Sequence, residues 1–488
     1  MSRTQRFMRG AFLSAASVLF SMLAMLAVGK MVTNAPALGK TEVGVFMLLL
    51  LGADFLNIAN NFGLWVALPK LVGAAAPAEQ CSIIRASFGC QTVVSLALAA
   101  ALLLTWRLFP GLEALATNPD WRAMFPYLWL LPPLFLAGTL RDNAMAALAG
   151  LNRYGTRALG IAASSFLQAT LVFSLVWWGG AGLVTLSLCM FGAYGTAFLL
   201  MHASLPFGRA PSLDWATYGK CVRFSLPLYA NSLLNFFFQR FDSLMVAAYL
   251  GLEQAAVYEI AKRFPMLLSR TLGTLQVPLL PSISELIAQD RREAAARLLN
   301  QALILSVFFG YLGVLFIVTI QEPLVGLLFN IDYLGAASVM GLLMTAICLA
   351  VQAGLMGLTL IALERPGLVT RTNALMAIIA VALNAVLLPK LGIAGGGISL
   401  LAAAAFSATM QTGHVRRLGI AVDLAMAVKM HVIMVTAASL AILGGTPVWR
   451  GLAMVFFVGL SFSFGAPHPR ELLSLVRTIL PSRRTREA

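Results

Sequence analysis

Charged residues inside long apolar stretches are the part of this 488-residue chain that could do chemistry. A charge near the middle of a bilayer costs about 2.5 to 3.5 kcal/mol on insertion scales, so such residues are functional candidates by default. The planar guanidinium of arginine can bind phosphate through two hydrogen bonds, and a membrane carboxylate can serve proton or sodium coupling. The candidates for anion binding are Arg141, Arg240, Lys262, Arg263 and Arg270, and those for ion coupling are Asp54, Asp242 and Glu259.

Structural ion pairing is an alternative role for some of these charges. Glu259 precedes Lys262 and Arg263 by three and four residues, the spacing at which side chains meet on a helix. Arg240 lies two residues from Asp242. Pairing within these groups would neutralise them without any ligand.

Asp54 and Arg270 are open to different interpretations. Asp54 could couple an ion, or it could be paired with Arg141 or Arg240. Arg270 has no carboxylate at helical spacing, and it shares a helix face with Arg263 seven residues earlier. Ligand contact is therefore favoured for Arg263 and Arg270.

The composition excludes an ordinary water-soluble protein. Hydrophobic residues make up 60% of the chain and charged residues 11%, against about 25% charged in typical soluble domains. The mean hydropathy is +0.86. A formal charge of +15 could indicate nucleic acid, a membrane surface or an anionic substrate, and the positions of the basic residues decide among them.

Fourteen stretches are long and apolar enough for membrane-spanning helices, which need about 20 residues each. The predicted spans are residues 8–33, 42–70, 82–106, 123–149, 156–178, 181–204, 220–249, 254–282, 296–320, 334–362, 367–389, 392–413, 425–444 and 447–466.

The basic residues orient these spans. If both termini are cytoplasmic, 24 of the 34 Lys and Arg residues lie at cytoplasmic span ends and six at outer ends, as the positive-inside rule requires. Most of the net charge therefore reflects topology, and no nucleic-acid partner is expected. Trp residues near the predicted outer ends agree: Trp106, Trp121, Trp177, Trp178 and Trp449.

Neither a metal site nor an enzyme is indicated. The five cysteines lie in or beside apolar runs without a C-x-x-C pair, and the four histidines are scattered near span ends. All loops between the spans are short, so the sequence leaves no water-soluble catalytic domain. We therefore expect no catalytic residue, metal or cofactor.

An internal repeat appears when the chain is aligned with itself at the offset that places Leu38 on Leu250. This offset carries the first predicted span onto the seventh, an even shift, so two six-helix halves would share one membrane orientation. The predicted fold is an all-α integral membrane protein with about 14 transmembrane helices, in which two six-helix bundles related by a pseudo-twofold axis along the membrane normal precede two C-terminal helices. Matching positions include Leu38-Gly39 with Leu250-Gly251, Leu68-Pro69 with Leu280-Pro281, Gly180 with Gly392, and Ser187-Leu188 with Ser399-Leu400.

Three segments carry a resemblance to a known superfamily. They are Asp242–Gly251, Ala256–Arg263, in which Ala256 replaces the usual glycine, and Asn384–Gly395. The chain resembles the multidrug/oligosaccharidyl-lipid/polysaccharide (MOP) flippases, and within them the lipid-linked oligosaccharide branch that serves O-antigen and exopolysaccharide assembly.

The resemblance implies a function. It implies translocation of a polyprenyl-pyrophosphate-linked oligosaccharide across the bacterial cytoplasmic membrane by alternating access, with both termini cytoplasmic. It leaves open H+ or Na+ as the coupling ion and glycan polymerase or export proteins as partners. A cation-coupled multidrug exporter and a peptidoglycan lipid-precursor flippase share the architecture, and a cavity of net positive charge would favour the glycan carrier over the drug exporter.

The predicted organisation has five parts. These are a first six-helix bundle (1–204), a cytoplasmic linker (205–219), a second six-helix bundle (220–413), two further transmembrane helices (425–466) and a cytoplasmic, amphipathic, basic tail (467–488).

Overall fold

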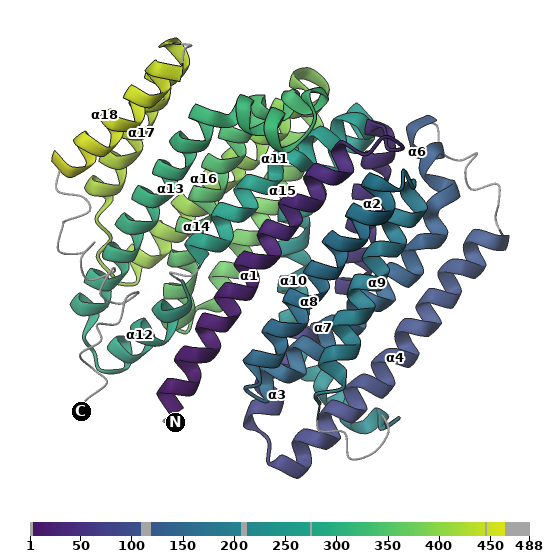
Figure 1. Ribbon diagram of the computed structural model, residues 1–488. Helices are drawn as coiled ribbons and strands as arrows, with labels where there is room; N and C mark the ends of the chain where they lie inside the picture. The colour runs from purple at the N-terminus through teal and green to yellow at the C-terminus, as the bar shows by residue number, and fades with distance from the viewer. Residues whose placement is uncertain (1–2, 109–118, 206–211, 274–275, 445–446, 464–488) are drawn as a thin grey trace. The chain divides into compact units, whose positions relative to one another are not determined.

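The protein is all-helical across the part of the chain that the structure describes. This computed structural model describes residues 3–108, 119–205, 212–273, 276–444 and 447–463, and every regular element in those ranges is a helix (Figure 1). Eleven of the described helical segments are long and apolar enough to cross a membrane. The other three predicted spans correspond to α10, to α11 with α12, and to α18, so the predicted membrane fold is confirmed. The predicted basic tail lies outside the described residues.

The chain forms two compact units, which divide within α11 and α13. Unit 1 is Met1–Ile260 with Gly326–Tyr333, and unit 2 is Ala261–Val325 with Leu334–Ala488. The predicted boundaries near residues 204 and 220 stay a prediction. They were placed from the internal repeat, and the compact units of a duplicated chain need not coincide with its repeats.

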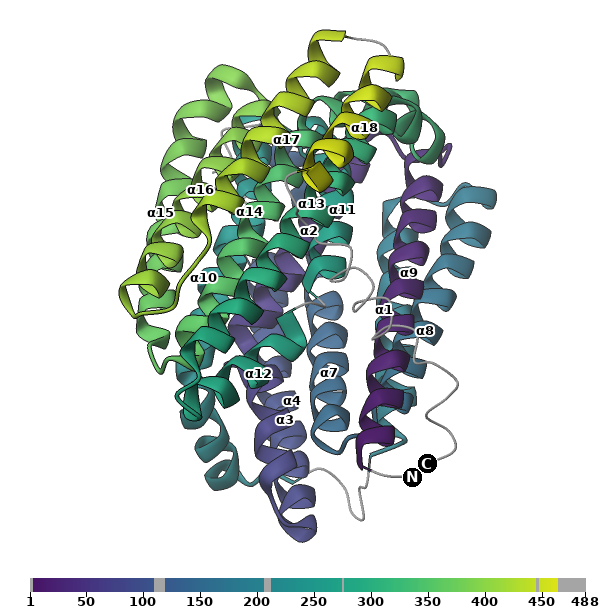
Figure 2. The same ribbon diagram turned by 90° about the vertical axis from the view of Figure 1, so that its left-hand side faces the viewer.

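Unit 1 is built around α7. This helix packs against α2, α3, α4 and α9, while α10 packs against α2, α3 and α4, and α1 lies along α8 (Figures 1 and 2). The helices are α1 (Arg3–Thr33), α2 (Lys40–Asn61), α3 (Leu64–Ala74), α4 (Pro77–Leu108), α6 (Pro119–Met124), η1 (Phe125–Leu130), α7 (Leu131–Gly150), α8 (Tyr154–Leu171), the π-helix η2 (Val172–Trp178), α9 (Leu183–His202), α10 (Trp215–Leu250) and the first part of α11 (Leu252–Gly273).

Unit 2 contains the later helices. Within it α16 packs against α14 and α15, α12 packs against α14, and α17 lies beside α18 (Figure 2). Its elements after α11 are α12 (Gln276–Ala288), most of α13 (Arg292–Leu328), the last part of η3 (Ile331–Ala336), α14 (Ala337–Ala362), α15 (Pro366–Leu391), α16 (Ile393–Arg417), α17 (Leu424–Gly444) and α18 (Pro447–Ser463).

The helix boundaries repeat at the offset found in the sequence. That offset carries the start of α2 onto the start of α11, and it also relates the ends of α7 and α14 and the starts of α8 and α15. Helix ends depend on local turn residues, so three coincidences at one offset argue against chance. The predicted internal duplication is therefore supported by the structure.

The turns between the helices repeat as well. Asn152 and Glu364, which the same offset superposes, both adopt left-handed backbone with φ of 56° and 60°. In each turn the next residue donates its backbone N–H back to the preceding helix, from Arg153 to Leu148 and from Arg365 to Leu360. This is a standard way for a helix end to satisfy its last carbonyls, and both halves use it at the same place.

The predicted second span, 42–70, is not one continuous helix. It breaks between α2 and α3, where Phe62 and Gly63 have positive φ values of 49° and 78°. Such a break frees backbone carbonyls that lipid cannot satisfy. Helix α10 satisfies two of them, since Ser225 Oγ donates to the carbonyl of Phe62 at 2.7 Å and the Tyr229 hydroxyl donates to that of Ala59 at 3.2 Å.

Replacing Gly63 by alanine should destabilise unit 1. An added Cβ would lie 2.9 Å from the backbone oxygen of Ser225, and left-handed backbone costs a non-glycine residue about 1 to 3 kcal/mol. We expect Gly63→Ala to lower the apparent melting temperature of the purified protein. The control is Gly219→Ala, whose Cβ would meet nothing within 4 Å. Equal melting of the two variants would contradict this account of the break.

Candidate functional site

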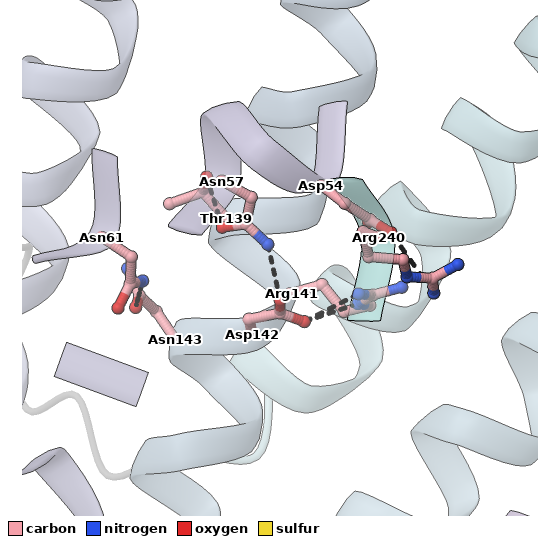
Figure 3. Close-up of polar contacts among 8 residues, drawn as sticks. All are labelled: Asp54, Asn57, Asn61, Thr139, Arg141, Asp142, Asn143 and Arg240. Carbon is pink, nitrogen blue, oxygen red and sulfur yellow. Dashed lines mark hydrogen bonds and ion pairs between the residues drawn. The ribbon is translucent and has the colours of Figure 1, made fainter. Parts of the chain in front are cut away.

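A cluster of five charged side chains lies among the membrane helices of unit 1. We call Asp54, Arg141, Asp142, Arg240 and Glu259 the charged cluster; they come from α2, α7, α7, α10 and α11 (Figure 3, which shows the first four). Asp54 lies in the electrostatic field of all four others, so the five act as one group. Each side chain is partly accessible, from 14% for Glu259 to 44% for Asp54.

One half of the cluster is tightly hydrogen-bonded. Arg141 donates from Nε and pairs through Nη2 with the same oxygen of Asp142, at 2.9 and 2.8 Å. Asn57 donates to the other oxygen of Asp142 at 2.6 Å, and Thr139 orients Asn57 through a 2.9 Å hydrogen bond (Figure 3). The guanidinium carbon of Arg141 lies 4.0 Å from the centre of the Tyr194 ring, a favourable cation–π arrangement.

The other half is loosely paired. Arg240 lies between two carboxylates, with Nη2 3.9 Å from Asp54 Oδ2 and Nη1 3.9 Å from Glu259 Oε2. Both distances exceed the usual 2.7 to 2.9 Å of a charge-assisted hydrogen bond. Arg240 is therefore held by charge attraction rather than by directed hydrogen bonds.

Asp242 is buried and hydrogen-bonded, in contrast to Asp54. It is 3% exposed, it accepts a 2.8 Å hydrogen bond from the Tyr258 hydroxyl, and it accepts the backbone N–H of Ser243 at 2.9 Å. The Ser243 hydroxyl donates to Glu259. These contacts give Asp242 a structural role that joins α10 to α11.

Replacing Tyr258 by phenylalanine tests this role. The change removes one donor from a buried carboxylate, which typically costs about 1 to 3 kcal/mol. We expect a lower apparent melting temperature for Tyr258→Phe, measured on purified protein. Tyr249→Phe, at a tyrosine that is 50% exposed, is the matched control. If Tyr258→Phe melted like this control, the hydrogen bond to Asp242 would not be structurally important.

The structure brings together four of the eight predicted residues. Asp54, Arg141, Arg240 and Glu259 share the charged cluster, and Asp242 lies beside it through Ser243. Lys262, Arg263 and Arg270 lie on the part of α11 that belongs to unit 2.

Four contributing residues were not among the predicted site residues. Asp142 follows Arg141 directly, but neighbours in a helix do not normally face each other, so adjacency gave no reason to expect their ion pair. Tyr194 and Thr139 carry no sequence signal, because their roles depend on how α7, α9 and α2 pack. Asn57 was noticeable only as part of a polar row with Asn60 and Asn61 that follows Asp54 along the helix.

The polar row continues into buried hydrogen bonds. Asn60 donates to Ser95 Oγ at 2.6 Å. Asn61 donates to Asn143 Oδ1 at 2.8 Å, as Figure 3 shows. These bonds tie α2 to α4 and α7 just before the break at residues 62 and 63. They hold in place the helix that carries Asp54. Within the described ranges, no three His, Cys, Asp or Glu side chains are grouped so that they could hold a metal ion.

Comparison with known proteins supports the fold and finds one family profile that matches part of the chain. The profile of a family described as "Polysaccharide biosynthesis protein" matches residues 153–338. A comparison with curated protein sequences finds no significant match.

Solved structures of three transporters are similar over most of the chain. A lipid II flippase MurJ in an inward closed conformation has a TM-score of 0.73 at 14% identity, covering 95% of this chain and 100% of its own. An inward-facing MATE-family multidrug resistance transporter of the MOP superfamily has a TM-score of 0.67 at 16% identity, covering 82% and 95%. A MOP superfamily transporter from Pyrococcus furiosus has a TM-score of 0.59 at 15% identity, covering 84% and 95%.

The chain thus has the fold of the MOP transporters. The family profile matches part of the chain, the shared fold extends over most of it, and the chain is a multi-pass membrane protein.

Proposed function

We propose that this protein is a flippase that moves a polyprenyl-pyrophosphate-linked oligosaccharide from the cytoplasmic to the outer leaflet of the bacterial inner membrane. The glycan would serve surface or exopolysaccharide assembly, and both termini would be cytoplasmic. The protein itself would catalyse no covalent reaction.

The observation that carries this proposal is the pair of arginines, Arg141 and Arg240, within membrane helices of unit 1. Two fixed positive charges are costly there, and guanidinium groups suit the oxygens of a pyrophosphate. The family description, which concerns polysaccharide biosynthesis, fits a lipid-linked glycan. Both arginine side chains are partly accessible, at 22% and 27%, so a ligand can reach them.

In this proposal the lipid tail stays in the bilayer while the charged head group crosses through the protein. The arginines replace part of the water that a pyrophosphate loses on entering a low-dielectric region. Lys262, Arg263 and Arg270, on the part of α11 that belongs to unit 2, are also proposed as anion-binding residues. Asp54, Asp242 and Glu259 are proposed as the carboxylates from which H+ or Na+ coupling would be built.

A second candidate is a cation-coupled multidrug exporter. The observation that favours it is the charge balance of the cluster, in which three carboxylates outnumber two arginines. A site of net negative charge attracts cations, whereas a net positive cavity was expected for the glycan carrier. The two functions differ in what accumulates when the protein is absent.

The test is to delete the gene and treat spheroplasts with a glycan-cleaving enzyme that cannot cross the membrane. The flippase proposal predicts that lipid-linked oligosaccharide accumulates and is protected from the enzyme until the gene is restored. Accumulation of accessible glycan would place the block after translocation and contradict the proposal. Sensitivity to cationic drugs without accumulation would favour the exporter. Accumulation of peptidoglycan lipid precursors instead would favour a peptidoglycan-precursor flippase.

A further inference from the structure

We infer that Arg240 binds the substrate's pyrophosphate by exchanging Asp54 and Glu259 for it, whereas Arg141 is a positioning residue that stays with Asp142. This inference rests on the proposed function and deepens it, because it divides the two arginines into different roles. It also assigns the two carboxylates beside Arg240 a role as internal anions that compete with the substrate.

The first step is the state of Arg240. Its guanidinium makes no hydrogen bond to any of the described residues, and its two ion pairs are both 3.9 Å long. An arginine has five N–H donors, and leaving them without acceptors inside a membrane protein is costly. Arg240 is also 27% accessible. Its donors are therefore available to an incoming anion.

The second step is the state of Arg141. Two of its nitrogens contact one oxygen of Asp142, and Tyr194 covers its guanidinium. Releasing Arg141 would break its two contacts with Asp142 and its contact with the Tyr194 ring. Asp142 is itself held in place by Asn57. Arg141 contacts α9 through Tyr194, and its two contacts with Asp142 leave it poorly placed to exchange that residue for a ligand.

The third step is charge. Asp54 and Glu259 are two acidic side chains that each lie 3.9 Å from the guanidinium of Arg240. A pyrophosphate that approaches Arg240 is repelled by both carboxylates, and this repulsion is strong where the dielectric constant is low. Neutralising either carboxylate should therefore strengthen anion binding. Loss of a residue that contacts a binding arginine would ordinarily be expected to weaken binding, so the predicted direction is distinctive.

The experiment measures binding of farnesyl pyrophosphate to the purified full-length protein in lipid nanodiscs at low salt. Farnesol, which has the same tail without the charge, reports the contribution of the lipid alone. Arg240→Gln should weaken binding at least about tenfold. Asp54→Asn and Glu259→Gln should each strengthen it about fivefold or more, the lower end of usual coupling between sites. Arg141→Lys, which keeps the charge, should change binding less than Arg240→Lys does.

The controls come from an ion pair of the same kind elsewhere. Arg450 Nη2 lies 3.3 Å from Glu322 Oε1 in unit 2, so Arg450→Gln and Glu322→Gln make the same changes of charge at residues outside the charged cluster. Neither should alter binding. Apparent melting temperatures identify variants that fail to fold, and the two carboxylate variants keep the inference testable if Arg240→Gln is unstable.

Several results would overturn the inference. It fails if Asp54→Asn and Glu259→Gln weaken binding, if Arg240→Gln leaves it unchanged, or if wild type binds farnesol as tightly as farnesyl pyrophosphate. The proposed function is tested separately by the spheroplast assay. If the wild-type chain restores glycan accessibility in spheroplasts but the variants do not bind farnesyl pyrophosphate in the predicted order of affinity, the inference fails and the proposed function stands.

Discussion

Asp142→Ala should be among the least stable single variants of unit 1. The change leaves Arg141 without its counter-charge, and Asn57 without its acceptor, among membrane helices. Removing one partner of a fully buried ion pair costs about 3 to 5 kcal/mol, and we expect somewhat less, about 2 to 4 kcal/mol, because both side chains are 22% accessible. The measurement is the fraction of detergent-solubilised protein that stays monodisperse after heating.

A double variant separates this cost from a general loss of packing. Arg141→Gln combined with Asp142→Asn removes both charges and keeps hydrogen-bonding groups, so it should recover most of the stability lost in Asp142→Ala. Asp332→Ala, at an exposed acid in η3, is the control for loss of a carboxylate. The ion pair would have no structural importance if Asp142→Ala behaved like Asp332→Ala.

Arg240→Gln should abolish most glycan translocation in cells while the protein still accumulates in the membrane. Each charge-assisted hydrogen bond contributes about 1.5 to 3 kcal/mol, so loss of the guanidinium should lower the rate about tenfold or more. Arg240→Lys should be intermediate, because a lysine keeps the charge but loses the planar, two-pronged geometry. The measurement is the enzyme-accessible fraction of lipid-linked glycan in spheroplasts of the deletion strain carrying each variant.

The matched control for this variant is Arg450→Gln, which removes an arginine from a comparable ion pair. It should restore accessibility as wild type does when expressed at the same level. A translocation rate equal to wild type in Arg240→Gln would remove the main support for an anion site in unit 1.

Much of the fold could be predicted from the sequence because a bilayer constrains helices strongly. Each predicted span corresponds to a helix or a helix pair, and the offset of the internal repeat recurs in helix ends and in the left-handed residues Asn152 and Glu364. The break at Phe62 and Gly63 was not predicted from hydropathy, because residues 42–70 are long and apolar enough overall to form one span. It depends on α10, which satisfies the freed carbonyls from a distant part of the chain.

The candidate site was predictable in its residue types and only partly in its pairs. The cost of charge in lipid singled out Arg141, Arg240 and Asp54, and the pairing of Asp54 with Arg240 was one of the alternatives. The contact of Arg240 with Glu259 joins two helices, and helical spacing within one segment does not predict it. The same holds for Asn57 and Asp142, which lie on different helices far apart in the chain.

The net charge of the site depends on which residues accompany the arginines. Sequence alone suggested a cationic cavity, because five basic residues were counted against three acidic ones. Within unit 1, Asp142 neutralises Arg141 directly, and Arg240 lies between two carboxylates. An anion carrier built in this way would regulate access to its arginine through its own acids, a property that a uniformly basic cavity would lack.

The most direct test of the account is transbilayer movement in liposomes that contain only the purified chain and a fluorescent polyprenyl-pyrophosphate-linked disaccharide. An external glycan-cleaving enzyme reports the fraction that reaches the outer leaflet, with and without imposed H+ and Na+ gradients. We predict movement well above protein-free liposomes for wild type and Glu322→Gln, and near the protein-free rate for Arg240→Gln. A wild-type rate equal to that of protein-free liposomes under every gradient, or equal movement of a glycolipid that lacks the pyrophosphate, would contradict the account.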